Sequence, residues 1–266
     1  MRLIVHGQEA YAYTGGKPFD ASLPTVVLIH GAMGDHSIWT LLARWFANHG
    51  RSVLAVDLPG HMRSAGPALA SVDAMADWVL ALMTAAGVHR AALAGHSLGS
   101  LVALEAAARA PERATTLLML GTCVPMPVPQ ALLDLGKQDV HAAIDRVVKF
   151  SISTLGAKPS YPGPGAWLHG GARALMRQVA SHSSDPMLFH TDFSACNDYR
   201  NGMNAAAKVA CAAHLVLAEQ DQMTLPRNAR EVAAVLKADI HRVPGGHFLM
   251  HEQPDLVLHA MRKALE

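Results

Sequence analysis

The interpretation of this chain starts from one short stretch, Gly95-His96-Ser97-Leu98-Gly99, which contains the pattern Gly-x-Ser-x-Gly. An apolar run, Ala91–Ala94, precedes it, and a helix-like run, Leu101–Arg109, follows it. Strand, sharp turn and helix in this order place the central serine at the tip of a strained turn. The two glycines have no side chains, which lets the strand and the helix approach each other closely. Ser97 is therefore a candidate nucleophile.

The composition favours a globular chain with a large buried core. The chain has 266 residues, of which 51% are hydrophobic and 16% charged. With 22 Lys and Arg against 21 Asp and Glu, the formal net charge is +1 and no basic cluster stands out, so a nucleic-acid partner is not expected. No apolar stretch is long enough to span a bilayer, and the N-terminus lacks a signal-peptide core.

The three cysteines indicate a reducing compartment. Cys123, Cys196 and Cys211 are odd in number and have no close pair spacing, so neither a disulfide framework nor a zinc site is suggested. The expected location is the cytoplasm. No cofactor is expected, and the sequence leaves the oligomeric state open, with a homodimer as one option.

Strand-like and helix-like runs alternate along most of the chain. The opening 3–5 and 9–14 runs are typical of an antiparallel pair. The runs at 25–29 and 53–56 show no polar alternation, as in strands that are covered on both faces. This alternation predicts an α/β fold with a mostly parallel eight-stranded sheet and helices on both faces. Strands are expected at 3–5, 9–14, 25–29, 53–56, 91–94, 115–120, 214–218 and 240–243, and helices at 39–46, 72–86, 98–110, 226–236 and 254–265.

The rhythm changes between residues 122 and 208. No buried strand is evident there, whereas amphipathic helical runs occupy 131–150 and 172–181. A structureless loop of this length inside a domain is uncommon. We therefore expect a helical lid at 122–208, inserted into a core formed by residues 1–121 and 209–266.

A candidate acid and a candidate base follow the last two predicted strands. A serine nucleophile needs a base to accept its proton, and the base needs a partner that orients it. Asp221 comes just after the strand at 214–218, and His247 comes just after the strand at 240–243. In a parallel sheet these loops open on the same edge as the turn at Ser97. The order Ser, Asp, His is the one expected for this type of fold.

These pieces together resemble the α/β-hydrolase superfamily. Residues 185–199 also resemble the segment that leads from the lid back to the sheet in small bacterial esterases and cofactor-free haloperoxidases. The matching pieces span nearly the entire chain, and they are His30-Gly31-Ala32-Met33-Gly34, Asp57–Ser64, Gly95–Gly99, the Asp221 loop and Gly246-His247.

The resemblance implies a role for each matching residue. Ser97 becomes the nucleophile, His247 the general base and later acid, and Asp221 its orienting partner. The backbone N–H groups of Ala32 and Leu98 become the oxyanion hole, where two donors stabilise the developing charge. The serine also separates this chain from the dehalogenases and epoxide hydrolases of the superfamily, whose resembling members carry aspartate at that position.

Several other residues were candidates for chemistry. His251 lies four residues after His247, a spacing that occurs in metal sites, but no set of acidic ligands accompanies it, so no metal is expected. His30 and His96 are expected to brace loops through hydrogen bonds. Glu219 and Asp198 are alternative acids, and Cys123 and Cys196 are interpreted as buried small hydrophobes.

The expected reaction is acyl transfer to water. Ser97 attacks the carbonyl of a small to medium, largely apolar carboxylic ester, and His247 activates water for deacylation, with activity rising as His247 loses its proton. C–C bond or enol-lactone hydrolysis and cofactor-free perhydrolysis need the same three residues and stay open, as does a non-catalytic small-molecule receptor.

Substrate recognition is expected from apolar side chains around Ser97. Methionines adapt to varied shapes, which favours a modest hydrophobic pocket. Arg173, Arg177 and Arg200 are candidates for binding an anionic substrate. The expected pocket residues are Met33, Met126, Trp167, Met187, Leu188, Met223 and Phe248.

Overall fold

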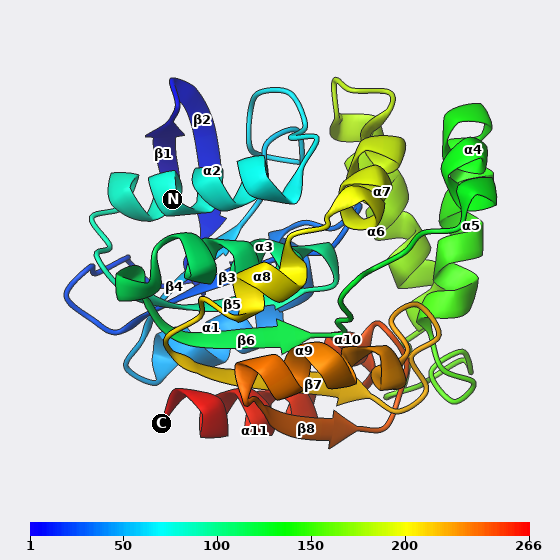
Figure 1. Cartoon of the computed structure of the whole chain (residues 1–266). Helices are drawn as coiled ribbons and strands as arrows, with labels where there is room; N and C mark the ends of the chain where they lie inside the picture. Colours follow the sequence, from blue (N-terminus) through cyan, green and yellow to red (C-terminus); the bar gives the residue numbers. More distant parts are fainter.

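Eight strands form one sheet in the order β1-β2-β4-β3-β5-β6-β7-β8 (Figure 1). The structure, a computed structural model, describes residues 1–266. Strand β2 is antiparallel to both of its neighbours, and all the other pairs are parallel, which confirms the expected sheet. The strands are β1 (Arg2–Val5), β2 (Gln8–Tyr13), β3 (Thr25–Ile29), β4 (Ser52–Val56), β5 (Ala91–His96), β6 (Ala114–Leu120), β7 (Ala212–Ala218) and β8 (Asp239–Val243).

The central strands are mostly apolar because helices cover both faces of the sheet. Successive side chains of a strand point to opposite faces. On β3, Val26 and Leu28 join one apolar cluster with α1 (Thr40–Asn48) and α11 (Pro254–Leu265). Val27 and Ile29 join another with α2, α3, α8 and α9. These four helices span Val72–Ala85, Leu98–Arg109, Gly202–Ala206 and Arg230–Leu236, and η1 (His36–Trp39), η2 (Pro111–Arg113), η3 (Pro226–Ala229) and α10 (Leu249–Glu252) are short.

The chain between β6 and β7 is helical. Helices α4 to α7 stand beside the sheet (Figure 1), whereas the short α8 packs against α3. The run expected as one helix at 131–150 is two helices, because Asp139 ends α4 and caps α5, its carboxylate accepting a hydrogen bond from the Ala142 N–H at 3.0 Å. The four helices are α4 (Gln130–Gln138), α5 (Val140–Ser151), α6 (Leu168–His182) and α7 (Leu188–Asp198).

The carboxyl ends of the parallel strands bring distant segments together. Strands β3, β5, β7 and β8 all end at this edge, and each is followed by a loop that carries a predicted site residue. Helices α4 to α7 form an apolar cluster that also contains Met33 and Phe248, one from each of two such loops. The helical segment therefore packs directly over the edge that carries the candidate site. No helix of the chain has both the length and the apolar character needed to cross a membrane.

Candidate active site

Ser97 occupies the strained turn that its flanking glycines make possible. Its backbone has φ 53° and ψ −120°, a conformation that costs a non-glycine residue energy. A Cβ on Gly95 would lie 1.9 Å from the Gly99 carbonyl oxygen, and one on Gly99 would lie 2.3 Å from the Ile29 carbonyl oxygen. Only glycine fits at either position, so the sequence pattern follows from the geometry of the turn.

Asp221 and His247 form a buried pair at the ends of β7 and β8. His247 Nδ1 lies 2.8 Å from Asp221 Oδ2, and Asp221 is 2% exposed. Asp221 Oδ1 accepts hydrogen bonds from the N–H groups of Met223 and Thr224, both at 2.8 Å, and Oδ2 accepts one from the Thr224 hydroxyl at 2.7 Å. Burial raises the pKa of Asp221, but the attraction of His247 and these hydrogen bonds outweigh it, so the pKa is lowered. Asp221 is therefore an anion that orients the imidazole.

The other nitrogen of His247 is free to take a proton. Nε2 makes no hydrogen bond with the protein, and both His247 and Ser97 line one small cavity of about 30 Å³. No hydrogen bond joins the Ser97 hydroxyl to His247 in this structure. Such catalytic hydrogen bonds often tighten only in the substrate complex.

Two backbone N–H groups beside Ser97 have no acceptor in the protein. Ala32 lines the small cavity, and its N–H makes no hydrogen bond. Leu98 begins α3, so its N–H has no partner within the helix. Hydrogen bonds to the Gly31 carbonyl oxygen hold the loop that carries Ala32. The Gly34 N–H donates one at 3.0 Å, and His30 Nδ1 lies 2.8 Å from the same oxygen. The two expected oxyanion donors are both available.

His30 and His96 hold backbone rather than line up for proton transfer. His30 Nε2 accepts a hydrogen bond from the Leu58 N–H at 3.0 Å, and burial lowers its pKa to about 4. His96 Nε2 lies 2.9 Å from the His247 carbonyl oxygen, and burial, with the nearby charge of His247, lowers its pKa to about 3. Both rings are neutral near neutral pH and fix the loops around the site.

Two cavities meet at Ser97. The small one is lined by Met33, Met223 and Phe248 of the expected pocket residues. The larger one, of about 380 Å³, is lined by Met126 and Met223 of that set. Side chains that sequence reasoning missed complete both walls: Leu175, Met176, Val147 and Phe193 at the small cavity, and Leu132, Arg146, Val147, Phe150 and Phe193 at the large one.

Three expected pocket residues lie outside these two cavities. Trp167 is 54% exposed and lines a separate surface pocket beside Phe248. Met187 is 36% exposed and lines neither cavity, and Leu188 is buried in the apolar cluster of the helical segment. In the sequence, an apolar side chain that packs inside the helical segment or lies exposed on it looks the same as one that lines a binding cavity.

The arginines expected to bind an anion are engaged elsewhere. Arg173 and Arg177 reach Asp145 at 2.8 and 3.1 Å, and Arg200 donates to the Asn197 carbonyl. None of the three lines either cavity. The spacing of Ile144, Val147 and Val148 indicates the buried face of α5. This periodicity does not show that Arg146, on the same helix, borders a cavity.

The alternative catalytic groups are placed less favourably. Glu219 and Asp198 are exposed, and neither contacts His247. Cys123 and Cys196 line the large cavity, yet burial raises the pKa of both thiols, to about 12 for Cys123. His247 precedes α10 and His251 lies within it, so the two do not share a helix face.

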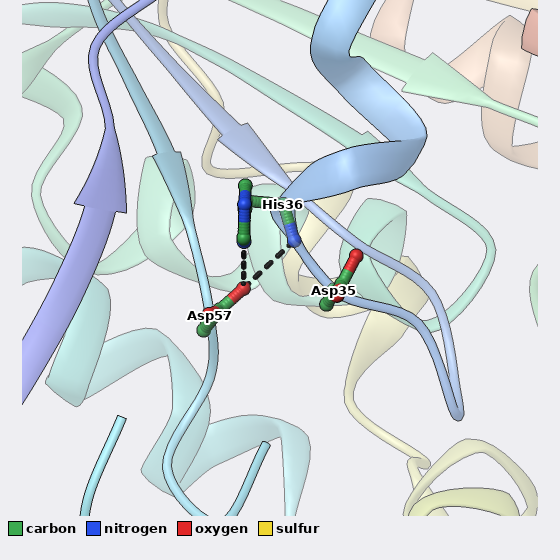
Figure 2. Close-up of side chains that lie close together, drawn as sticks. All are labelled: Asp35, His36 and Asp57. Atoms are coloured by element: carbon green, nitrogen blue, oxygen red, sulfur yellow. Dashed lines mark hydrogen bonds and ion pairs between the residues drawn. The ribbon is translucent and has the colours of Figure 1, made fainter. Parts of the chain in front are cut away.

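One further cluster of potential metal ligands lies where the loop after β3 meets the end of β4 (Figure 2). Single ligand atoms of Asp35, His36 and Asp57 lie within 4.8 Å of one another. Asp57 Oδ1 accepts hydrogen bonds from the His36 N–H at 2.8 Å and from its Nδ1 at 2.7 Å, and Asp57 Oδ2 accepts one from the Arg63 N–H at 3.2 Å. Asp35 caps the following turn by accepting from the Ser37 N–H at 2.8 Å. The cluster ties the loop after β3 to the end of β4.

Comparison with known proteins gives a family match over most of the chain. A family described as the Alpha/beta hydrolase family matches residues 26–260. Among solved structures, the enol-lactonase from Burkholderia xenovorans LB400 has a TM-score of 0.84 and 20% identity, covering 100% of this chain and 99% of its own. An esterase from Exiguobacterium antarcticum has a TM-score of 0.83 and 15% identity, covering 99% and 98%.

Curated relatives match over shorter segments. The dihydrolipoyllysine-residue acetyltransferase component of an acetoin cleaving system from Pseudomonas putida is 38% identical over 103 residues, which are 36% of this chain and 26% of the relative. The 2-succinyl-6-hydroxy-2,4-cyclohexadiene-1-carboxylate synthase of Escherichia coli O8 is 35% identical over 105 residues, 40% of this chain and 38% of the relative. The chain thus matches less than half of the length of either relative.

Proposed function

Because the chain belongs to the α/β-hydrolase family, we propose that it hydrolyses carboxylic esters through an acyl-enzyme on Ser97. The observation that carries the proposal is the shared cavity: Ser97 at the tip of its strained turn and His247, held by Asp221 at 2.8 Å, line the same small space. A nucleophile, a base and an oriented carboxylate in one cleft are the components of a serine hydrolase.

The first half-reaction forms the acyl-enzyme. Ser97 Oγ attacks the carbonyl carbon while His247 Nε2 accepts the hydroxyl proton. The carbonyl oxygen becomes an oxyanion and accepts hydrogen bonds from the N–H groups of Ala32 and Leu98, neither of which has an acceptor in the protein. The imidazolium then donates its proton to the leaving alcohol oxygen as the C–O bond breaks.

The second half-reaction returns the enzyme to its starting state. His247 Nε2 accepts a proton from a water molecule whose oxygen attacks the acyl carbon. The resulting oxyanion collapses, the Ser97–acyl bond breaks, and Ser97 recovers its proton from the imidazolium. Asp221 stays ionised throughout, because its lowered pKa favours the carboxylate.

The helical segment supplies the walls that select the substrate. We assign residues 122–208 as a lid on a core of residues 1–121 and 209–266, since α5 and α7 contribute Val147 and Phe193 to both cavities. The small cavity, at about 30 Å³, has room for about one or two water-sized groups. The larger one, at about 380 Å³, accommodates the long part of a small to medium ester.

The test is hydrolysis of p-nitrophenyl esters of graded chain length by the wild type and by Ser97→Ala. We expect turnover by the wild type, and a loss of about 10⁵-fold or more in kcat for the variant. An enol-lactone and a vinylogous diketone, assayed beside the esters, separate ester hydrolysis from the other reactions open to the same three residues. Turnover of these compounds alone would overturn the ester assignment.

A fluorophosphonate probe tests the nucleophile without a substrate. The wild type should be labelled at Ser97, and Ser97→Ala should not. A chain that stays unlabelled is a receptor with an inactive site rather than a hydrolase, and wild-type turnover in Ser97→Ala would place the nucleophile elsewhere.

A further inference from the structure

We propose that the larger cavity selects substrates with a carboxylate at the end remote from the scissile carbonyl, and that Arg146 binds this carboxylate. The proposal rests on the ester hydrolysis at Ser97 proposed above and names the substrate class of that site. It is carried by the distribution of polar and apolar side chains along the cavity between Ser97 and its mouth.

The cavity is lined by buried apolar side chains and by exposed side chains of both kinds. Met126, Leu132, Val147 and Phe193 are buried, whereas Pro127, Pro129 and Phe150 are exposed apolar lining residues. Three exposed polar side chains, Arg146 of α5 with Gln222 and Asn228 of the loop after β7, line the same cavity. A ligand that fills it therefore meets buried apolar walls and, on the exposed part of the lining, hydrogen-bond donors.

The lining of the larger cavity carries positive charge only. Arg146 is the one charged side chain among the lining residues, and no aspartate or glutamate is present there. The amide groups of Gln222 and Asn228 supply further donors and make no side-chain hydrogen bonds within the protein. Guanidinium with amide donors is the donor set that recognises a carboxylate, and the planar guanidinium can bind both of its oxygens.

Arg146 differs from the neighbouring lid arginines in having no partner. Asp145, the residue before it, is occupied by Arg173 at 2.8 Å and by Arg177 at 3.1 Å. Arg146 makes no ion pair or side-chain hydrogen bond, so its guanidinium is available to a ligand. In the lid, Arg173 and Arg177 thus share the carboxylate of Asp145, whereas Arg146 lies beside the cavity without an ion-pair partner.

The experiment compares matched ester pairs. The mono-p-nitrophenyl esters of adipate, pimelate and suberate carry a terminal carboxylate, and p-nitrophenyl hexanoate, heptanoate and octanoate are their uncharged counterparts. The measured quantity is the ratio of kcat/KM within each pair, for the wild type, Arg146→Gln and Lys149→Gln. Lys149 lies one turn along α5, is exposed and does not line the cavity, so its variant removes the same charge from the same helix.

We expect at least one half-ester to be preferred by the wild type, and Arg146→Gln to lower that preference by about 10-fold, because a hydrogen-bonded ion pair is removed. Lys149→Gln should keep it. The preference should also weaken as salt is added, since the guanidinium is exposed.

Preference for the uncharged ester in every pair, or an equal loss in both variants, would overturn the assignment of Arg146. These outcomes require that esters are hydrolysed. No turnover of any ester, charged or uncharged, would instead contradict the proposed function.

We infer, independently of Arg146, that Asp192 is a positioning residue for the oxyanion donors. Asp192 lies on α7, is fully buried, and its Oδ2 accepts a hydrogen bond from the Met33 N–H at 2.8 Å. Met33 directly follows Ala32 and has φ 55°, a conformation that costs a methionine energy. A lid carboxylate therefore holds the residue next to an expected oxyanion donor in a strained backbone conformation.

His61 completes this contact. Its Nε2 lies 3.0 Å from Asp192 Oδ2, and its Nδ1 lies 3.1 Å from the Pro59 carbonyl oxygen. Both partners are acceptors, so both ring nitrogens donate and His61 is an imidazolium. The buried contact with His61 holds the Asp192 carboxyl group in place against Met33.

The test separates positioning from folding. In Asp192→Asn we expect kcat per active site, counted by fluorophosphonate titration, to fall about 10- to 100-fold, with KM changed much less, because misplaced donors weaken transition-state binding. Asp185→Asn is the matched control, since Asp185 accepts a hydrogen bond from the Met187 N–H just before α7 and does not touch the Met33 loop. A smaller titratable fraction with unchanged kcat per site would show that Asp192 serves folding alone.

Discussion

The protein contains two buried aspartate–histidine pairs, and they differ in whether the histidine has a ring nitrogen without a protein partner. In the core pair, His247 Nδ1 is 2.8 Å from Asp221, and Nε2 has no protein partner. In the lid pair, His61 Nε2 is 3.0 Å from Asp192, and Nδ1 faces the Pro59 carbonyl. Only His247 lines the cavity that contains Ser97.

The comparison shows that a histidine that is buried and paired with an aspartate is not, for that reason alone, able to act as a general base. A general base needs a nitrogen that can accept a proton from the nucleophile. His61 donates through both nitrogens, so it is a structural cation that joins the lid to the loop after β4. His247 contacts Asp221 through Nδ1, and its Nε2 has no protein partner, which is what the proposed role as a base requires.

The largest effect should come from removing the histidine of the core pair. We expect His247→Ala to lower kcat for p-nitrophenyl ester hydrolysis by about 10⁵-fold or more, because the base and the proton donor are lost together. His61→Asn, measured beside it, should keep far more activity. Equal losses in two folded variants would contradict the different roles assigned to the two pairs.

The carboxylate of the core pair should matter less than its histidine. Asp221→Asn keeps the size of the side chain but removes the charge that orients and stabilises the imidazolium, so kcat should fall about 10³- to 10⁴-fold. The measurement is the same ester assay, with circular dichroism to verify folding. Activity within a few-fold of wild type would assign the orienting role to another acid, with Glu219 and Asp198 as the residues to test next.

The carboxylate of the lid pair should matter most for stability. Asp192→Ala leaves His61 as a buried group without its partner, so the free energy of unfolding should fall by about 3–5 kcal/mol. Urea unfolding of this variant and of Asp185→Ala measures the difference. A loss below about 1 kcal/mol would show that the pair is not an intact buried ion pair.

The smallest effect is a pH dependence of that stability. Burial by itself lowers the pKa of His61. The negative charges of Asp192 and, to a lesser degree, Asp57 outweigh burial, so the pKa of His61 is raised. The His30 ring also packs against His61, with 4.8 Å between the ring centroids. A raised folded pKa gives stability that is complete below the unfolded value, about 6.5, and is lost as pH rises through the folded value. The stability difference between wild type and Asp192→Asn should therefore be larger near about pH 6 than near about pH 9. A constant difference in urea unfolding would argue against a charged His61.

The positions of the central strands and of the candidate core residues could be predicted because their signals are local. Uninterrupted apolar runs mark strands that are covered on both faces, as in Thr25–Ile29. A Cβ at position 95 or 99 would lie only 1.9 or 2.3 Å from a backbone carbonyl oxygen, so both positions require glycine. The local sequence therefore predicts the turn at Ser97. Asp221 and His247 follow strands directly, and the parallel sheet places both loops at one edge.

The roles of the lid side chains could not be predicted from the sequence, because its apolar side chains occupy three different environments. Met126 lines a cavity, Leu188 is packed among helices, and Trp167 is exposed, although all three have similar chemical character. The break between α4 and α5 depends on one capping aspartate, Asp139, inside an otherwise continuous helical pattern.

The sequence by itself determined the family, the fold and the candidate residues Ser97, Asp221 and His247, because short-range rules of strand, turn and chain order specify them. Tertiary structure alone decided which lid side chains border the cavities, that Arg146 is free while Arg173 is paired, and that Asp192 meets His61 and Met33 across the chain. These contacts join residues far apart in sequence, and only packing brings their atoms within hydrogen-bond distance.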